Sequence, residues 1–284
     1  MSIIAISVMI LGGIGIISAA ILYLTAKKFH VEEDPNIEAI DALLPGANCG
    51  ACGYSGCHDF AVNCASAETL DGHVCPSSGQ AVMDKIAEIL GMKAANVKTQ
   101  IAVLHCNGTC ENRPKTSKYD GPSSCNILHS LYIGSSDCAY GCLGEGDCMA
   151  VCRFDAIKMN TITGLPEFDE EKCVGCGICV KGCPRHIIEL RDKGPKGRRV
   201  YAACANKEKG ALAIKECKTS CIGCGKCVKE CSFQAITVTD NLAYIDYSKC
   251  KLCRKCIDAC PTHVIHAVNF PAPQAIKKEG GESC

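Results

Sequence analysis

An unbroken run of apolar and small residues opens the chain, from Ile3 to Ala26, and it ends at Lys27 and Lys28. About 20 such residues cross the hydrocarbon core of a bilayer as one helix. Glycines inside the run favour close packing against another membrane helix. The pattern therefore predicts a transmembrane anchor over residues 1–28.

Two other interpretations of this run are weaker. A cleaved signal peptide needs a basic segment before the apolar run, and only Met1 and Ser2 precede it. A helix buried in a soluble protein would be unusually long and uniformly apolar. Basic residues beside a membrane helix stay on the cytoplasmic side, so Lys27 and Lys28 predict that the bulk of the chain lies in the cytoplasm, at the inner membrane.

The apolar pattern changes after a polar linker predicted over residues 29–40. Apolar residues at helical spacing predict a helix over residues 79–93, which we expect to pack through one face. Short strands are predicted at residues 100–104, 165–169 and 242–246. Together these elements indicate an α+β fold. The residues on the packing face of the helix are Val82, Ile86, Ile89 and Leu90.

Composition points to ligation chemistry, because 27 of the 284 residues are Cys. Such a density indicates either a disulfide scaffold in an oxidising compartment or metal and cluster ligation in a reducing one. Disulfide scaffolds rarely repeat their cysteines at one spacing, so we favour ligation. The formal net charge is zero, which gives no indication of nucleic-acid binding.

One cysteine spacing recurs four times between residues 138 and 260. Its clearest copy is C-x2-C-x2-C-x3-C-P from Cys173 to Pro184, and in every copy an isoleucine follows the last Cys by five residues. In bacterial ferredoxins with two [4Fe–4S] clusters, the first three cysteines of such a run bind one cluster and the fourth binds the other. The four isoleucines are Ile157, Ile188, Ile236 and Ile265.

This crossing rule pairs the runs into two ferredoxin-like units, at residues 138–190 and 217–268. We expect the isoleucines to pack against the clusters and exclude water. Arg153 and Ser232 stand where proline is usual, and the first run has wider gaps than the others. Zinc is the alternative ligand, but the third Cys in each tight loop disfavours it. The predicted ligand sets are Cys138/Cys142/Cys148/Cys183, Cys152/Cys173/Cys176/Cys179, Cys221/Cys224/Cys227/Cys260 and Cys231/Cys250/Cys253/Cys256.

A separate four-cysteine motif lies in a domain predicted over residues 41–98. Glycines at 50, 53 and 56 let the backbone fold closely around an inorganic group. Structural zinc usually pairs two C-x2-C motifs, and only one is present here, so we favour one [4Fe–4S] cluster. Its predicted ligands are Cys49, Cys52, Cys57 and Cys75.

The segment over residues 99–137 carries cysteines outside any quartet. Cys106, Cys110 and Cys125, joined by Cys204 or Cys217, would make a sixth cluster; the alternative is that they are unligated thiols. The prediction is therefore five clusters, with the sixth left open. A tail over residues 269–284 is predicted to be disordered, with Cys284 outside the ligand sets.

A basic connector spans residues 191–216. One interpretation is a solvated turn, and the other is a docking patch for an acidic redox protein, guided by electrostatic complementarity. The residues predicted for docking are Arg191, Lys193, Lys196, Arg198 and Arg199.

The motifs together resemble the B subunit of Rnf electron-transport complexes, in a long form with two ferredoxin-like units. The resemblance covers nearly the whole chain. It rests on the anchor, on the ferredoxin repeats, on L-P-G-x-N-C-G-x-C-G-Y-x-G-C at residues 44–57, and on Y-G-C-L-G-E-G-D-C at residues 140–148. It implies a membrane complex that passes electrons between ferredoxin and NAD+, coupled to Na+ or H+ movement. This subunit would be the point where electrons arrive from ferredoxin.

The residues themselves indicate electron transfer without a complete active site. The chain has no glycine-rich dinucleotide fingerprint between a strand and a helix and no set of catalytic side chains, so flavin- and NAD-binding subunits are expected as partners. Two alternatives stay open: a subunit of another membrane enzyme, such as a hydrogenase or a heterodisulfide-reductase-like complex, and a redox sensor. A sensor needs an output domain, which the sequence does not indicate.

Overall fold

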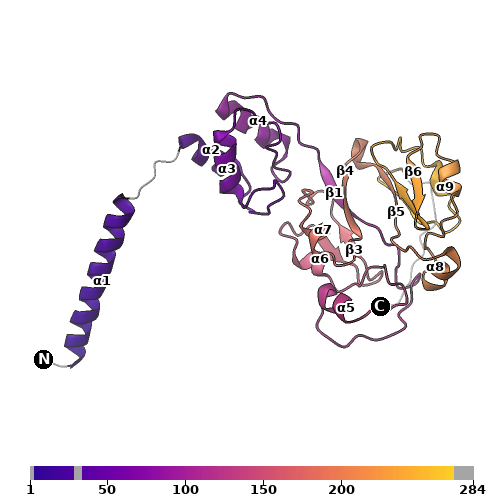
Figure 1. The fold of residues 1–284 in the computed structure, drawn as a ribbon, viewed down its shortest axis with the longest axis horizontal. Helices are drawn as coiled ribbons and strands as arrows, with labels where there is room; N and C mark the ends of the chain where they lie inside the picture. The colour runs from indigo at the N-terminus through magenta and orange to yellow at the C-terminus, as the bar shows by residue number, and fades with distance from the viewer. Residues whose placement is uncertain (1–2, 29–33, 272–284) are drawn as a thin grey trace.

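The computed structural model describes residues 3–28 and 34–271, without the side chains of residues 3–10 and 26. Part of the predicted linker and most of the predicted tail, with Cys284, lie outside these residues. Figure 1 shows the order of the parts along the chain: a long helix, a small helical domain, and two units of short helices and strands.

Helix α1 (Ile3–Lys28) occupies the apolar run, and its described apolar side chains, such as Leu11 and Leu22, are exposed. Among the described residues, no helix was found with the length and apolarity that crossing a bilayer requires. The membrane anchor therefore stays a prediction.

The helical domain contains α2 (Pro35–Leu43), α3 (Cys57–Ser66) and α4 (Gly79–Leu90). Helix α2 begins inside the predicted linker, because Asp34 caps it by accepting from the Asn36 N–H at 2.9 Å and Pro35 fits its first turn. The predicted face of α4 is partly wrong, since Ile89 is exposed while Met83 is buried. The fully buried core side chains of this domain include Ile40, Phe60, Leu70, Met83 and Ile86.

Ferredoxin unit 1 contains a β-hairpin and a second pair of antiparallel strands. Its hairpin is β2 (Ile157–Met159) with β3 (Pro166–Phe168), and its helices are α6 (Asp147–Ala150) and α7 (Ile178–Gly182). The second pair joins β4 (Ile188–Asp192) to β1 (Gln100–Leu104). Strand β1 precedes the predicted unit, so the unit takes one strand from the segment expected to be a connection.

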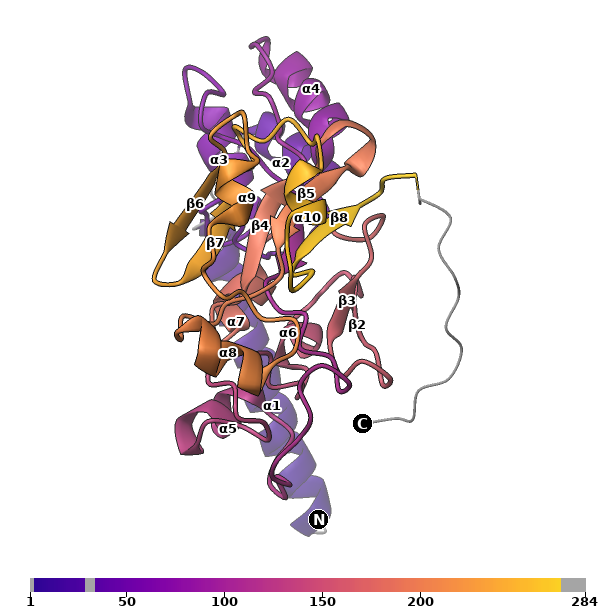
Figure 2. The ribbon, with the colours of Figure 1, turned by 90° about the vertical axis from the view of Figure 1, so that its right-hand side faces the viewer.

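Ferredoxin unit 2 repeats this plan. Its hairpin is β6 (Ile236–Thr239) with β7 (Leu242–Ile245), and β8 (Ile265–Val268) pairs with β5 (Arg199–Ala202), which lies in the predicted basic connector. Helices α9 (Lys226–Lys229) and α10 (Lys255–Asp258) lie side by side (Figure 2). The connecting elements are α5 (Cys125–Leu131), the 3-10 turn η1 (Pro195–Gly197) and α8 (Gly210–Glu216).

The four recurring isoleucines have one role in both units. Each begins a strand (β2, β4, β6 or β8) and is buried, with 3–4% of its surface exposed. Ile157, Ile188 and Ile265 each line a pocket bordered by cysteines. The repeat therefore places one water-excluding side chain beside these cysteine pockets.

Candidate iron–sulfur sites

In the part of the chain that the structure describes, six groups of four cysteines form, and we number them by their order in space. Pocket linings define the four middle groups, and neighbouring thiol charges and shared packing define the two end groups. The groups are Site 1 (Cys49, Cys52, Cys57, Cys75), Site 2 (Cys152, Cys173, Cys176, Cys179), Site 3 (Cys125, Cys142, Cys148, Cys183), Site 4 (Cys106, Cys138, Cys204, Cys217), Site 5 (Cys221, Cys224, Cys227, Cys260) and Site 6 (Cys231, Cys250, Cys253, Cys256).

Site 1 lies in the helical domain and depends on a residue of its own loop. Asn48 adopts φ of 45°, and its side-chain oxygen accepts from the Cys57 N–H at 2.7 Å, which caps α3. A side chain at Gly56 would approach that oxygen to 2.8 Å, so only glycine fits there. Burial raises the pKa of the Cys52 thiol, and the thiols of Cys75 and Cys49 add to the rise.

Sites 2, 5 and 6 bring together the same cysteines as the crossing rule does, and their binding of clusters stays a prediction. Burial raises the pKa of Cys179 in Site 2 to about 12, with further contributions from the thiols of Cys173 and Cys176. Main-chain N–H groups point at several sulfur atoms: Ala243 donates to Cys221 and Ala235 donates to Cys231, each at 3.4 Å. Such N–H groups stabilise thiolate ligands of iron–sulfur clusters and tune their potentials.

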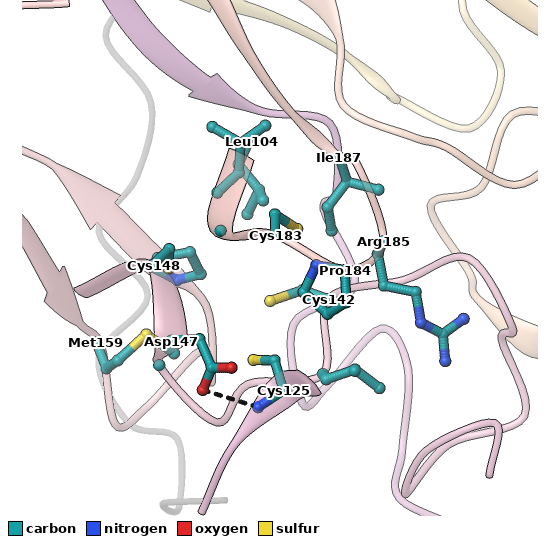
Figure 3. A pocket seen from close by; sticks show the side chains of 15 residues that line it. Leu104, Cys125, Cys142, Asp147, Cys148, Met159, Cys183, Pro184, Arg185 and Ile187 are labelled. Carbon is teal, nitrogen blue, oxygen red and sulfur yellow. Dashed lines mark hydrogen bonds between the residues drawn. The ribbon is translucent and has the colours of Figure 1, made fainter. Parts of the chain in front are cut away.

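Site 3 differs from the prediction in one cysteine. Cys125 takes the place expected for Cys138, and the labelled side chains of Cys125, Cys142, Cys148 and Cys183 surround one pocket (Figure 3). The Asp147 carboxylate fixes Cys125 by accepting from its N–H at 2.8 Å. Although burial opposes this, the N–H groups of Asn126 and Cys125 keep the pKa of Asp147 below its usual value. A carboxylate at the start of α6 thus positions a cysteine from a distant loop.

Site 4 collects cysteines that the repeats left without a quartet. Cys138 lines this pocket with Cys106, Cys204 and Cys217, whereas Cys110 lines none of the four pockets. Asn206, which is 2% exposed, donates to the Cys138 sulfur at 3.6 Å and to the Glu216 carboxylate at 2.8 Å. Cys138 therefore lines a different pocket from Cys142, with which the repeat grouped it, because the wider first run places Cys138 at the neighbouring pocket.

The donor set of each site is four thiols, which fits a [4Fe–4S] cluster. No three His, Cys, Asp or Glu side chains in the described part of the chain are placed as ligands of one metal ion. At Sites 2–5, the four thiols of each site line one shared pocket. Four thiols around an apolar space, with N–H groups aimed at sulfur, match the ligation of a [4Fe–4S] cluster.

Each site has a ligand beside the next site, so the six form a series. Cys49 of Site 1 lies close enough to Cys176 of Site 2 to raise the pKa of that thiol, although burial contributes most of the rise. Burial raises the pKa of Cys179 of Site 2, and the thiol of Cys148 of Site 3 adds to that rise. Burial also raises the pKa of Cys256 of Site 6, and the thiol of Cys227 of Site 5 adds to that rise.

Site 4 closes the gap between the two ferredoxin units. The Cys142 N–H donates to the Cys106 sulfur at 3.4 Å, which joins Sites 3 and 4. The Cys221 N–H donates to the Cys204 sulfur, also at 3.4 Å, which joins Sites 4 and 5. Without Site 4, the series would be broken in its middle.

Two of the predicted docking residues are unavailable to a partner, which corrects that prediction. Arg191 is 1% exposed and pairs with Glu189 at 3.1 Å, surrounded by the rings of Tyr201, Tyr244 and Tyr247. Arg199 is buried as well and pairs with Glu170 at 2.6 Å. They lie on strands β4 and β5, whose burial the charge run in the sequence did not reveal. Lys193, Lys196 and Arg198 stay at least partly exposed.

Comparison with known proteins gives the same chemistry. The family described as "4Fe-4S dicluster domain" matches residues 220–265, "Putative Fe-S cluster" matches residues 44–72, and "4Fe-4S binding domain" matches residues 165–188. The first match lies over Sites 5 and 6 and the second over three of the four cysteines of Site 1. The third lies over three cysteines of Site 2 and Cys183 of Site 3.

Whole-length relatives cover most of the chain. It is 45% identical to the B subunit of the Na(+)-translocating ferredoxin:NAD(+) oxidoreductase complex of Acetobacterium woodii, over 90% of the chain and 75% of that protein. It is 34% identical to the B subunit of the proton-translocating complex of Clostridium ljungdahlii, over 90% and 89%, and 33% identical to that of the ion-translocating oxidoreductase complex of Methanosarcina acetivorans, over 91% and 96%. The chain therefore belongs to the B-subunit family of ion-translocating ferredoxin:NAD(+) oxidoreductase complexes, the Rnf complexes.

Proposed function

We propose that this chain is the iron–sulfur subunit that carries electrons from reduced ferredoxin into a membrane complex that reduces NAD+ and moves Na+ or H+. The observation that carries this proposal is the continuous series of six four-cysteine sites. The family membership supports it, because relatives are named as subunits of such oxidoreductases. The flavin- and NAD-binding parts would belong to partner subunits.

The residues of the chain would hold the clusters and set their surroundings. A [4Fe–4S] cluster, when bound, supplies a reversible one-electron change. The cysteines of each site hold it in place, and main-chain links such as Cys142 to Cys106 keep neighbouring sites close together. The buried isoleucines exclude water, which is one means of setting a reduction potential.

The direction of flow in this proposal runs from Site 6 to Site 1. Site 1 lies in the domain that follows α1 directly in the chain, and α1 is proposed as the single membrane anchor, with the rest of the chain on the cytoplasmic side. The uncharged sequence from residue 3 to residue 26, followed by two lysines, supports that anchor. Electrons would leave near the membrane and arrive at the far end.

The test is metal and sulfide content of the full-length chain, purified under strict anaerobiosis, together with EPR after dithionite reduction. Six clusters correspond to about 24 iron atoms per chain, and five correspond to about 20. We expect about 24 and the signals of reduced [4Fe–4S] clusters. Zinc in place of iron, or protein that dithionite cannot reduce, would overturn the proposal.

A further inference from the structure

The site at the far end of the series has a thiol at the molecular surface. Among the described cysteines whose thiols are free, only Cys224 and Cys253 are exposed, and Cys253 belongs to Site 6. An electron donor that approaches Cys253 would therefore reach the end of the series directly. Beside it lies an open groove of about 570 Å³ between α10 and β8, with Ile257, Ile265 and Val268 in its lining.

Basic residues surround Cys253, and we call Lys249, Lys251, Arg254 and Lys255 the basic rim. The three lysines are exposed and Arg254 is half-buried. Of the nearby carboxylates, Asp246 lies 3.6 Å from Lys249, and Asp258 stands exposed on α10. The rim therefore keeps a net positive charge.

This charge is not a property of the repeat. In unit 1 the residues that correspond to Lys251, Arg254 and Lys255 are Val174, Gly177 and Ile178. The same ligand spacing thus folds without a basic rim. Lys249 has a counterpart in Lys172 of unit 1, and Lys226 stands at the position of Lys255 in the first run of unit 2. Lys251 and Arg254 are therefore the charges that set Site 6 apart.

The rim has the same left-handed backbone as unit 1 but carries side chains where unit 1 has glycines. Leu252 and Arg254 adopt φ of 58° and 68°, where unit 1 has Gly175 and Gly177 at 69° and 76°. A side chain is disfavoured in this left-handed region because its Cβ crowds the following carbonyl oxygen. Residues kept in such a conformation cluster where function needs their side chains.

Part of the basic connector adjoins the rim. Arg254 lies 4.9 Å and Arg198 lies 5.5 Å from the ring of Phe270, so both guanidinium groups pack against one aromatic side chain. Lys196 is exposed on the same turn as Arg198. These two residues of the predicted docking segment therefore extend the rim, while Arg191 and Arg199 do not.

We propose that the basic rim, extended by Arg198, docks an acidic ferredoxin-type protein with its cluster facing Cys253. This inference rests on the proposed function and names the surface that serves it. Opposite charges would steer the encounter and fix its orientation. In the step itself, one electron leaves the reduced donor protein, which becomes oxidised, and the chain gains that electron at Site 6 without making or breaking a bond.

The test compares two double charge reversals in the full-length, anaerobically purified chain. Lys251→Glu with Lys255→Glu alters the rim, and Lys172→Glu with Lys181→Glu makes the same charge change on exposed lysines of unit 1. The probe is a fluorescently labelled acidic [4Fe–4S] ferredoxin in its oxidised form, whose binding is followed by anisotropy at several salt concentrations. Binding needs no turnover, so the readout is independent of activity.

We expect the rim variant to bind at least about tenfold more weakly at low salt and to lose most of its salt dependence. The unit 1 variant should stay within about twofold of the unaltered chain. Equal weakening in both variants, or none in either, would overturn the docking surface. So would a rim variant that loses affinity for anionic lipid vesicles but keeps its affinity for ferredoxin.

Iron content and dithionite-reduced EPR of both variants separate this inference from the proposed function. If the unaltered chain shows reducible [4Fe–4S] clusters and the rim variant still binds ferredoxin normally, only the docking surface fails. If the unaltered chain holds no reducible cluster, the proposed function fails and takes the docking surface with it.

Discussion

The guanidinium of Arg153 donates a hydrogen bond to the main-chain carbonyl oxygen of Asn48 over 3.0 Å and a second one to the carbonyl of Ala47. Arg153 follows Cys152 of Site 2, and Asn48 precedes Cys49 of Site 1. One exposed side chain therefore joins the helical domain to ferredoxin unit 1 at the place where their sites meet. Proline, which is usual at this position of the repeat, has no donor with which to do so.

We predict that Arg153→Ala loosens this junction. Two exposed hydrogen bonds to carbonyls contribute about 1 kcal/mol of domain docking in total, after allowance for competition with water. Hydrogen exchange in residues 44–50 should become faster, and the magnetic interaction between reduced clusters at Sites 1 and 2 should weaken in EPR. Lys158→Ala, on the exposed edge of β2, is the matched control and should change neither. Unchanged exchange and unchanged EPR in the Arg153 variant would show that the junction holds without it.

The ligand sets of Sites 3 and 4 predict how single cysteines affect iron content. Cys106→Ser should remove the cluster of Site 4, and Cys125→Ser should remove that of Site 3, each with a loss of about 4 iron atoms per chain. Cys64→Ala is the control, because Cys64 is buried in the helical domain outside every set of four. An iron content that stays unchanged in the Cys125 variant would restore Cys138 as the ligand of Site 3.

The sequence repeat groups the same cysteines that lie together at Sites 2, 5 and 6, and the difference at Site 3 has a physical reason. Where cysteines follow one another at tight spacing, the loop alone brings their thiols to one site, as it does for Cys173, Cys176 and Cys179. Cys106, Cys125 and Cys204 come from separate loops. Their grouping depends on contacts such as that of Asp147 with the Cys125 N–H. No local spacing encodes such a contact.

Charge patterns predicted less than cysteine patterns. Arg191 and Arg199 looked like part of an exposed basic run, yet strand pairing buries both of them against carboxylates. The signal that was available is the apolar residue next to each arginine, Leu190 beside Arg191 and Val200 beside Arg199. Strand β5, however, pairs with β8, which lies far along the chain. Long-range pairing of short strands is the information that a single sequence does not contain.

Arg191 is predicted to matter for stability and not for docking. The Glu189 carboxylate accepts from His105 at 2.6 Å, from Arg191 at 3.1 Å and from Tyr244 at 2.8 Å. Arg191→Met removes the buried cation and leaves the carboxylate without its charged partner, a change that typically costs about 3–5 kcal/mol. Anaerobic denaturant unfolding measures this, with Arg198→Met on the surface as the control.

The pH dependence of the stability lost in Arg191→Met follows from the pKa of Glu189. Burial alone would raise its pKa, but the hydrogen bond from His105 and the charge of Arg191 outweigh burial and lower the pKa of Glu189 to about 2. A lowered pKa contributes stability above the ordinary value of about 4.3, and this contribution disappears only as the pH falls toward 2. The difference between Arg191→Met and the unaltered chain should therefore be constant between pH 5.5 and pH 8 (roughly, the range above the ordinary Glu pKa). A difference that changes across this range would assign the effect to another titrating group.

Two variants of Arg254, which has a left-handed backbone, should differ in stability but not in ferredoxin binding. Arg254→Gly restores the residue that unit 1 has at this position, and Arg254→Gln removes the charge while keeping the side chain in the left-handed region. Both variants lose the contact with Phe270, so their difference isolates the backbone. The glycine variant should be more stable than the glutamine variant by about 0.5–1 kcal/mol in denaturant unfolding, part of the gain being offset by the freer unfolded chain.

Both should bind an acidic ferredoxin more weakly than the unaltered chain, and to the same extent, because both lack the same charge. If the glycine variant were the less stable of the two, Arg254 would not be strained, and the argument that docking maintains it there would be wrong.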